Sequence, residues 1–129
     1  MVVVVYCDGM NGGGKRLLDA IGSPAPDCRT EVYSSITGLL KRIRRRKGDV
    51  SVALLCASSS KELEQLVGFC DLLLDLRIIL ILPDRGSETL SRGLLLRPRF
   101  FSFWDTDFAD VSTVLRRMLL IYGKQSVQF

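Results

Sequence analysis

Apolar and polar positions along this chain follow two alternating patterns. Four short runs are apolar at nearly every position, which is typical of strands buried on both faces of a sheet. These runs are residues 2–7, 50–57, 77–83 and 100–104. A fifth run, residues 29–34, is more polar and predicts a strand at the edge of the sheet. The pattern therefore predicts five strands.

Between these strands, apolar residues recur every three or four positions, as on one face of an amphipathic helix. The clearest example is formed by Ile36, Leu39, Leu40 and Ile43, in a helix that Gly48 ends. The other predicted helices are residues 15–21, a helix that Ser59 or Ser60 caps, residues 87–95, and a last helix that Asp105 or Asp107 caps. Each predicted strand is thus followed by one predicted helix.

Five strand–helix units in succession predict an α/β fold, a single (βα)5 doubly wound parallel sheet. Because strands that are apolar on both faces must be covered on both faces, the domain should be a three-layer sandwich. Right-handed crossovers leave few topologies for five strands, and we favour the flavodoxin-like order 2-1-3-4-5. A chain of 129 residues suffices for one such core, so we predict one domain, residues 1–123, and a C-terminal tail, residues 124–129.

Composition argues against several kinds of chemistry. The chain has no histidine, which removes the commonest general base and the commonest metal ligand. The four cysteines, at positions 7, 28, 56 and 70, lie far apart and lack the spacing of a zinc site, so we predict no metal and no cofactor. Free cysteines in apolar runs indicate a reducing compartment, and no apolar stretch approaches the roughly 20 residues of a membrane span. We therefore expect a cytoplasmic protein without membrane contact.

The positive net charge comes from one helix. The chain has 18 Lys and Arg against 14 Asp and Glu, and six of the 18 form the basic patch Lys41, Arg42, Arg44, Arg45, Arg46 and Lys47. Since Ile43 continues the buried face, these six side chains should wrap the solvent side of their helix. We favour a solvated helix face; nucleic-acid binding through residues 41–47 is a weaker alternative. No aromatic residue lies among them to stack on bases.

A glycine-rich segment, GMNGGGKR at residues 9–16, joins the first strand to the first helix. It matches the P-loop pattern GxxxxGK up to Arg16, which stands where a Ser or Thr would hold Mg²⁺. Backbone N–H groups at a helix start can bind an anion, and the candidate residues here are Gly12, Gly13, Gly14 and Lys15. We favour a glycine-rich turn without a ligand. A small phosphate- or nucleotide-binding protein that uses residues 9–15 is the alternative.

The carboxyl ends of the strands in such a sheet meet at one edge, where binding sites form. The chain resembles the receiver domains of bacterial two-component response regulators over nearly all of its length. The clearest part is RFFSFWDTDFADVSTVLRRML, residues 99–119, which is similar to the receiver's fifth strand, acidic loop and last helix. The segments DVSVALLCA and RIILILPD resemble the third and fourth strands. The resemblance implies the same fold and a role in signalling.

Receiver phosphorylation requires two acidic residues after strand 1, an aspartate ending strand 3, a Thr or Ser ending strand 4 and a Lys ending strand 5. Only Asp8 matches an acidic position. No carboxylate lies between Val50 and Lys61, and no lysine lies between residues 61 and 124. The matching positions form a degenerate pocket of Asp8, Ala57, Ser58, Pro83, Asp84, Trp104 and Asp105. The resemblance thus implies a pseudo-receiver, a non-catalytic module that acts by protein–protein interaction.

Receiver-like domains commonly pair through one face, which here comprises the helix at 87–95, the strand at 100–104 and the last helix. Leu94, Leu95 and Leu96 are consecutive, and a short helix cannot turn all three toward the core, so at least one should be exposed. Apolar residues rimmed by arginines suit a homodimer or another protein partner. The candidate interface residues are Leu94, Leu95, Phe101, Phe103 and Arg116, near Arg92, Arg97 and Arg117. Alternatively, the spare leucine packs under the loop around Pro98.

Overall fold

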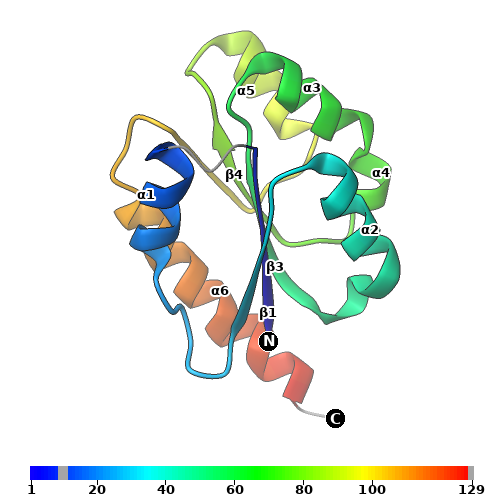
Figure 1. The fold of residues 1–129 in the computed structure, drawn as a ribbon, viewed down its shortest axis with the longest axis vertical. Coiled ribbons are helices and arrows are strands. Elements are labelled where there is room, and N and C mark those ends of the chain that lie inside the picture. Colours follow the sequence, from blue (N-terminus) through cyan, green and yellow to red (C-terminus); the bar gives the residue numbers. More distant parts are fainter. Residues whose placement is uncertain (9–11, 128–129) are drawn as a thin grey trace.

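The computed structural model describes residues 1–8 and 12–127, and its centre is a parallel sheet (Figure 1). The sheet has five strands in the order β2-β1-β3-β4-β5, which confirms the predicted topology. The strands are β1 (Val2–Cys7), β2 (Arg29–Tyr33), β3 (Val50–Cys56), β4 (Ile78–Leu82) and β5 (Phe100–Phe103). The helices are α1 (Gly12–Ile21), α2 (Ile36–Arg46), α3 (Ser60–Gly68), α4 (Cys70–Leu73), α5 (Ser87–Leu94) and α6 (Ala109–Val127), with a short 3-10 turn, η1 (Lys47–Asp49), after α2.

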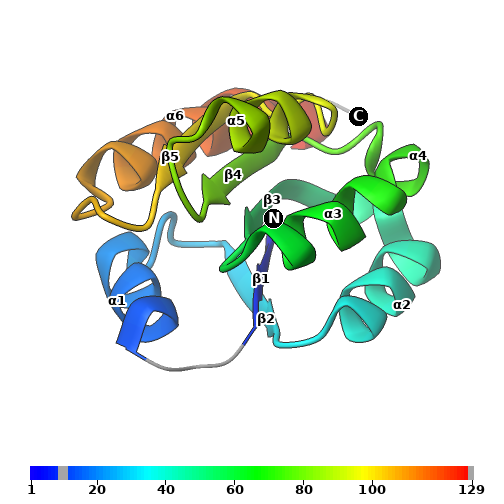
Figure 2. The same ribbon diagram turned by 90° about the horizontal axis from the view of Figure 1, so that it is seen from above.

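Helices cover both faces of the sheet, so the predicted three-layer sandwich is also confirmed (Figure 2). Helices α1 and α6 pack on one face, where Leu17, Phe108 and Leu115 meet the strands. Helices α2 to α5 pack on the other face, which contains residues such as Leu39 and Leu63. Strands β1, β3 and β4 are buried at every position, because they lie inside the sheet and have a helix layer above and below.

Serine and aspartate side chains accept hydrogen bonds from backbone amides at the start of three helices. The Ser35 hydroxyl accepts a hydrogen bond from the Gly38 N–H at 3.1 Å and caps α2. The Ser59 hydroxyl accepts one from Glu62 N–H at 3.2 Å, so Ser59, and not Ser60, caps α3. Before α6, Asp107 Oδ1 accepts the Ala109 N–H at 3.0 Å. These bonds satisfy amide groups that have no partner inside the helix.

Two helices are longer than the apolar pattern predicts. Helix α1 begins at Gly12, three residues before the predicted start, because a glycine-rich first turn has no apolar side chain to mark it. Helix α6 continues to Val127, so residues 124–127 of the predicted tail extend the last helix. No proline interrupts this segment, and Lys124 and Gln125 favour helix. Within the described ranges, none of the helices has both the length and the hydropathy to span a bilayer.

The prediction that all six basic residues of the segment 41–47 face solvent is wrong for Arg42, whose side chain is only 2% exposed. Its Nε donates to Glu31 Oε1 of β2 at 2.5 Å, and its Nη2 donates to Asp49 Oδ1 at 2.9 Å. A third bond, from Nη1 to the Arg46 carbonyl at 2.8 Å, completes its hydrogen bonding. Arg42 thus ties α2 to the edge strand, because two carboxylates compensate its burial.

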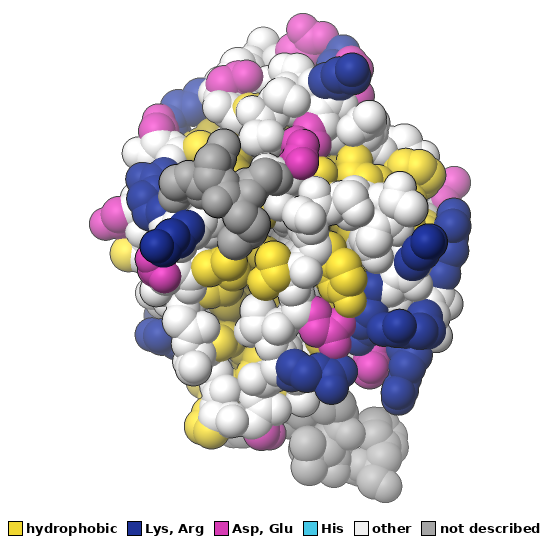
Figure 3. Space-filling model, in the orientation of Figure 1, with side chains coloured by type: hydrophobic (Ala, Val, Ile, Leu, Met, Phe, Trp, Pro, Cys, Tyr) yellow, Lys and Arg dark blue, Asp and Glu magenta, His cyan; other side chains and the backbone are white. Residues whose placement is uncertain are grey.

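The remaining basic patch is Lys41, Arg44, Arg45, Arg46 and Lys47, on the side of the molecule where α2 lies (Figure 3). Two of these residues have acidic neighbours: Arg46 lies 3.6 Å from Asp49, and Lys47 lies 3.6 Å from Asp75. Both pairs are wider than a hydrogen bond and include one strongly exposed side chain, so they contribute little to stability.

The buried charge of Arg42 predicts a large loss of stability on Arg42→Ala. The substitution removes the buried partner of Glu31 and Asp49 and leaves Glu31 with Arg29 and Tyr33 alone, so we expect the free energy of unfolding to fall by about 3 kcal/mol. Urea denaturation measures the change. Arg44→Ala, an exposed position on the same helix, is the matched control and should change stability by less than about 0.5 kcal/mol. Equal effects of the two substitutions would contradict the assigned role of Arg42.

The same cluster predicts the pH dependence of this difference. Burial acts to raise the pKa of Glu31, but hydrogen bonds from Arg42 and Tyr33 outweigh it and hold the pKa below its ordinary 4.5. A carboxylate whose pKa is lowered on folding contributes stability above its unfolded pKa and loses it as the pH falls through its folded pKa. The gap between wild type and Arg42→Ala should therefore narrow below pH 4.5.

Candidate functional site

The carboxyl ends of β1, β3, β4 and β5 lie at one edge of the sheet, as the parallel topology requires. Asp8 follows β1, Ala57 and Ser58 follow β3, and Pro83 follows β4. Every residue of the predicted degenerate pocket therefore comes from one of these four strand ends. Residues 9–11 of the glycine-rich segment lie outside the described residues.

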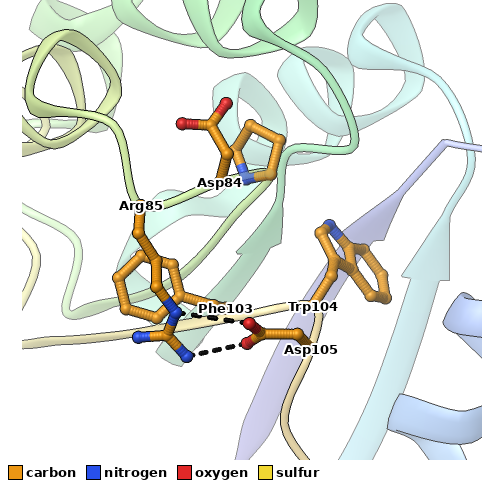
Figure 4. Close-up of a pocket in the computed structure, with 6 residues that line it drawn as sticks. Asp84, Arg85, Phe103, Trp104 and Asp105 are labelled. Atoms are coloured by element: carbon orange, nitrogen blue, oxygen red, sulfur yellow. Dashed lines mark hydrogen bonds and ion pairs between the residues drawn. The ribbon is translucent and has the colours of Figure 1, made fainter.

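Two of the four loops enclose a hollow of about 480 Å³ (Figure 4). Its walls are Pro83, Asp84, Arg85, Phe103, Trp104 and Asp105. Four of the seven predicted pocket residues line it, whereas Asp8, Ala57 and Ser58 lie outside its walls. Sequence reasoning missed Arg85; the signal that could have identified it is a cation directly after Asp84, in a loop that ends a buried strand.

Trp104 is fixed across the ends of β3 and β5. Its indole Nε1 donates a hydrogen bond to the Ala57 carbonyl at 2.8 Å, which joins positions 47 residues apart in the chain. The indole also packs edge-to-face against Phe108, with ring centroids 5.8 Å apart. Phe108 adopts the left-handed region at φ 63°, and Arg16 lies over its ring at 4.8 Å. Trp104 therefore has one position, which several neighbours determine.

Arg85 and Asp105 link the loop after β4 to the loop after β5. Arg85 Nη2 lies 2.8 Å from Asp105 Oδ1, and Nε lies 3.2 Å from Oδ2, so the pair is bidentate. The Arg85 guanidinium also lies 4.0 Å above the Phe103 ring. The hydrogen bond from Arg85 lowers the pKa of the exposed Asp105 carboxyl.

Asp84 has a backbone partner. Its Oδ1 accepts the Gly86 N–H at 2.8 Å, and this bond lowers the pKa of Asp84. The two carboxylates in the wall of the hollow are therefore already engaged, Asp84 with backbone and Asp105 with Arg85. Among the residues that the structure describes, no group of three or more Cys, Asp or Glu is placed to hold a metal ion.

Glu62 is a buried acid beside this edge of the sheet. It lies in the first turn of α3, and the residue is only 5% exposed. Its Oε2 accepts the Ser58 hydroxyl at 2.8 Å, and its Oε1 has no partner in the described part of the chain. Burial raises the pKa of Glu62, with a contribution from the Asp8 charge, although the Ser58 hydrogen bond opposes the shift. The pKa of the neighbouring Tyr6 is raised as well, by burial and by Glu62.

The candidate anion-binding residues lie at the start of the first helix. Gly12, Gly13 and Gly14 belong to the first turn of α1, and Lys15 is an exposed residue of the same helix.

Three of the candidate interface residues at the end of α5 and on β5 are exposed. Leu94 and Leu95 are 57% and 59% exposed, and Phe101 is 38% exposed, whereas Leu96 is buried in the core. The spare leucines are therefore not packed under the loop around Pro98. Phe103 lies in the hollow under Arg85.

Two arginines near this face differ in their partners. Arg92 pairs with Glu64 and with Glu88, so its charge is compensated and it is not a free part of the rim. Arg116 is exposed on α6. Arg97 and Arg117, also predicted near this face, are exposed as well.

Solved structures with the same fold include two receiver proteins. A response regulator receiver protein from Pseudoalteromonas atlantica has a TM-score of 0.64 and 11% identity, over 98% of this chain and 99% of that one. The signal receiver domain of the response regulator NarL from Mycobacterium tuberculosis has a TM-score of 0.63 and 20% identity, over 91% and 94% of the two chains. The fold is therefore receiver-like, which confirms the resemblance seen in the sequence.

A third solved structure with this fold is that of a pilus assembly-related protein from Burkholderia pseudomallei. It has a TM-score of 0.65 and 14% identity, over 92% of this chain and 90% of that one. No protein-family model and no curated protein sequence matches the chain. At these identities the likeness establishes the fold alone.

The buried carboxyl of Glu62 predicts that Glu62→Gln stabilises the protein at neutral and alkaline pH. Because the pKa is raised on folding, the native state binds more protons, and stability is lost as pH rises from the ordinary 4.5 through the raised value. Glutamine keeps an oxygen for the Ser58 hydroxyl without the charge. We expect a gain on the order of 1 kcal/mol at neutral pH, because a neutral amide costs less to bury than a charged carboxylate.

Thermal denaturation at acidic and at neutral pH measures this effect. The gain should shrink on acidification, since both variants then carry a neutral group at this position. Asp19→Asn, at an exposed position of α1, is the control and should give a change below about 0.5 kcal/mol. A gain for Glu62→Gln that does not depend on pH would contradict the assigned burial of charge.

Proposed function

We propose that this chain is a receiver-like regulatory module that is not phosphorylated and that acts by binding protein. The observation that carries the proposal is the hydrogen bond from Trp104 Nε1 to the Ala57 carbonyl, at 2.8 Å. A phosphorylated receiver needs a carboxylate where β3 ends and an ammonium where β5 ends. Here an alanine and an indole stand at those positions and are bonded to each other.

The neighbouring charged groups do not replace the missing ones. The charge of Arg85 is neutralised by Asp105, so it is not free to stabilise a phosphoryl group. Asp84 accepts a backbone N–H, and Glu62 is buried with Ser58. Since phosphoryl transfer depends on positioned charges, this arrangement favours a non-catalytic role.

A structural role is in keeping with one of the solved structures of this fold, which is described as pilus assembly-related. Its description suggests that a receiver-like domain can serve in an assembly. For this chain we propose the same general kind of action, through contact with another protein or with a second copy. The four cysteines are free, which fits a cytoplasmic location.

The contact surface we propose is the apolar face formed by the end of α5, by β5 and by α6. Leu94 and Leu95 are more than half exposed, Phe101 is 38% exposed, and Arg116 and Arg117 are exposed on α6. Large exposed apolar side chains that lie together are typical of interaction sites. Arginine suits the rim of such a site, because it tolerates partial burial and pairs with carboxylates of a partner.

The absence of phosphotransfer is tested by incubation with acetyl phosphate and Mg²⁺. We expect the intact mass to remain that of the unmodified chain, because β3 ends without a carboxylate. Addition of a phosphoryl group would contradict the proposal, and the same treatment of Asp8→Asn would show whether Asp8 had accepted it. A typical phosphorylatable receiver domain serves as the positive control for the reagent.

The contact surface is tested by sedimentation at micromolar concentration. We expect self-association that Leu95→Glu weakens at least tenfold, since the substitution places a charge in an apolar contact. Leu74→Glu is the matched control, because Leu74 is 50% exposed at the end of α4, away from this face. A monomeric wild type, or equal weakening by both substitutions, would remove this face from the proposal.

A further inference from the structure

Two cysteine thiols lie side by side beneath the strand ends. Cys7 is the last residue of β1 and Cys56 is the last residue of β3, and the two are direct partners in the register of these adjacent strands. Both side chains belong to the core cluster under α1 and α6, so they project from the same face of the sheet. Both thiols are free in this structure.

The geometry of the sheet brings these thiols within bonding reach. Neighbouring strands are about 4.8 Å apart, and disulfides join residues whose Cα atoms are about 4.4–6.8 Å apart. A hydrogen bond between the two sulfur groups lowers the pKa of Cys7, although burial opposes the shift. Burial and the same bond raise the pKa of Cys56 far above its ordinary value. Cys7 is therefore the thiol of the pair that ionises first.

We propose that Cys7 and Cys56 form a reversible disulfide when the protein meets hydrogen peroxide. The Cys7 thiolate attacks one peroxide oxygen, the O–O bond breaks, and the products are a sulfenic acid on Cys7 and hydroxide. The Cys56 sulfur then attacks the Cys7 sulfur, the S–O bond breaks, and the proton of Cys56 leaves in water. Overall, two thiols are oxidised, and one peroxide is reduced to two molecules of water.

Burial determines which oxidant can act and how long the product lasts. Cys7 is 3% exposed and Cys56 is fully buried, so a small oxidant such as peroxide is favoured over a bulky disulfide. Cys7 adjoins the exposed Asp8 at the end of β1, which places it nearer to solvent. Cβ atoms on parallel neighbours are about as far apart as the strands, beyond the roughly 3.5–4.5 Å that a disulfide prefers. The bond should thus be strained and easily reduced.

The disulfide would act directly on the site described above. It would clamp β1 to β3 one residue before Ala57, whose carbonyl accepts the Trp104 indole. Trp104 is the single tryptophan of the chain, so its fluorescence reports on this end of the sheet. The inference does not depend on the proposed function, because it concerns only these two thiols.

The other two cysteines provide an internal comparison. Cys28 precedes β2, whose first residue pairs with Val2, so Cys28 lies toward the opposite end of β1 from Cys7. Cys70 begins α4 and packs against the other core cluster. Neither is placed to pair with Cys7 or Cys56.

The experiment treats the full chain with hydrogen peroxide and maps its cysteine peptides without reduction. We expect one linked peptide pair, Cys7 with Cys56, a loss of the mass of two hydrogen atoms, and a change in Trp104 fluorescence that dithiothreitol reverses. The Cys28→Ser/Cys70→Ser double variant should respond in the same way, whereas Cys56→Ser should lose no hydrogen pair. The peptide map of the wild type tests the proposal even if Cys56→Ser does not fold.

Three results would overturn the inference. Cysteines 7 and 56 that remain free after treatment would show that the thiols are inaccessible. Accumulation of sulfinic acid on Cys7 without a linked peptide would show that Cys56 does not reach it. Linkage of either residue to Cys28 or Cys70 would show that oxidation follows unfolding and not the native register.

Discussion

The burial of three central strands on both faces is the constraint on which the rest of this structure depends. Strands β1, β3 and β4 are buried at every position, so each needs a helix layer above and below it. That requirement favours parallel strands with helical crossovers, and right-handed crossovers leave few strand orders, of which this chain has β2-β1-β3-β4-β5. The same order brings the carboxyl ends of four strands together at one edge. A binding site can form at this edge whatever side chains lie there.

Several side chains at that edge are engaged by neighbouring loops. Trp104 is bonded to Ala57, and Arg85 is bonded to Asp105, so two pairs of loops are tied by contacts that leave few groups free for chemistry. Such an edge can still transmit information, because a change in one loop moves the partner it is bonded to. These contacts are the physical basis of our proposal that the module binds protein and is not phosphorylated.

Buried polar groups mark the places where sequence patterns were least informative. Arg42 lies in a run of six basic residues, and nothing in that run distinguishes it from its neighbours; only the carboxylates of Glu31 and Asp49, which folding brings to it, make its burial favourable. Glu62 has the form of an exposed capping residue, yet its carboxyl is buried against Ser58 near Tyr6. In both cases the deciding partner lies on another element or in the preceding loop.

The sequence by itself determined the strands, the helix order, the three layers and the edge at which a site must lie, because apolar periodicity directly reflects which faces are buried. It also shows that no carboxylate lies between Val50 and Lys61 and that no lysine lies between residues 61 and 124. Only the tertiary structure decided that Trp104 bonds to Ala57, that Arg85 faces Asp105, that Leu96 is buried beside exposed Leu95, and that Cys7 lies beside Cys56. These pairings depend on strand register and loop paths, which bring distant residues together. They do not appear as a periodic pattern of apolar residues in the sequence.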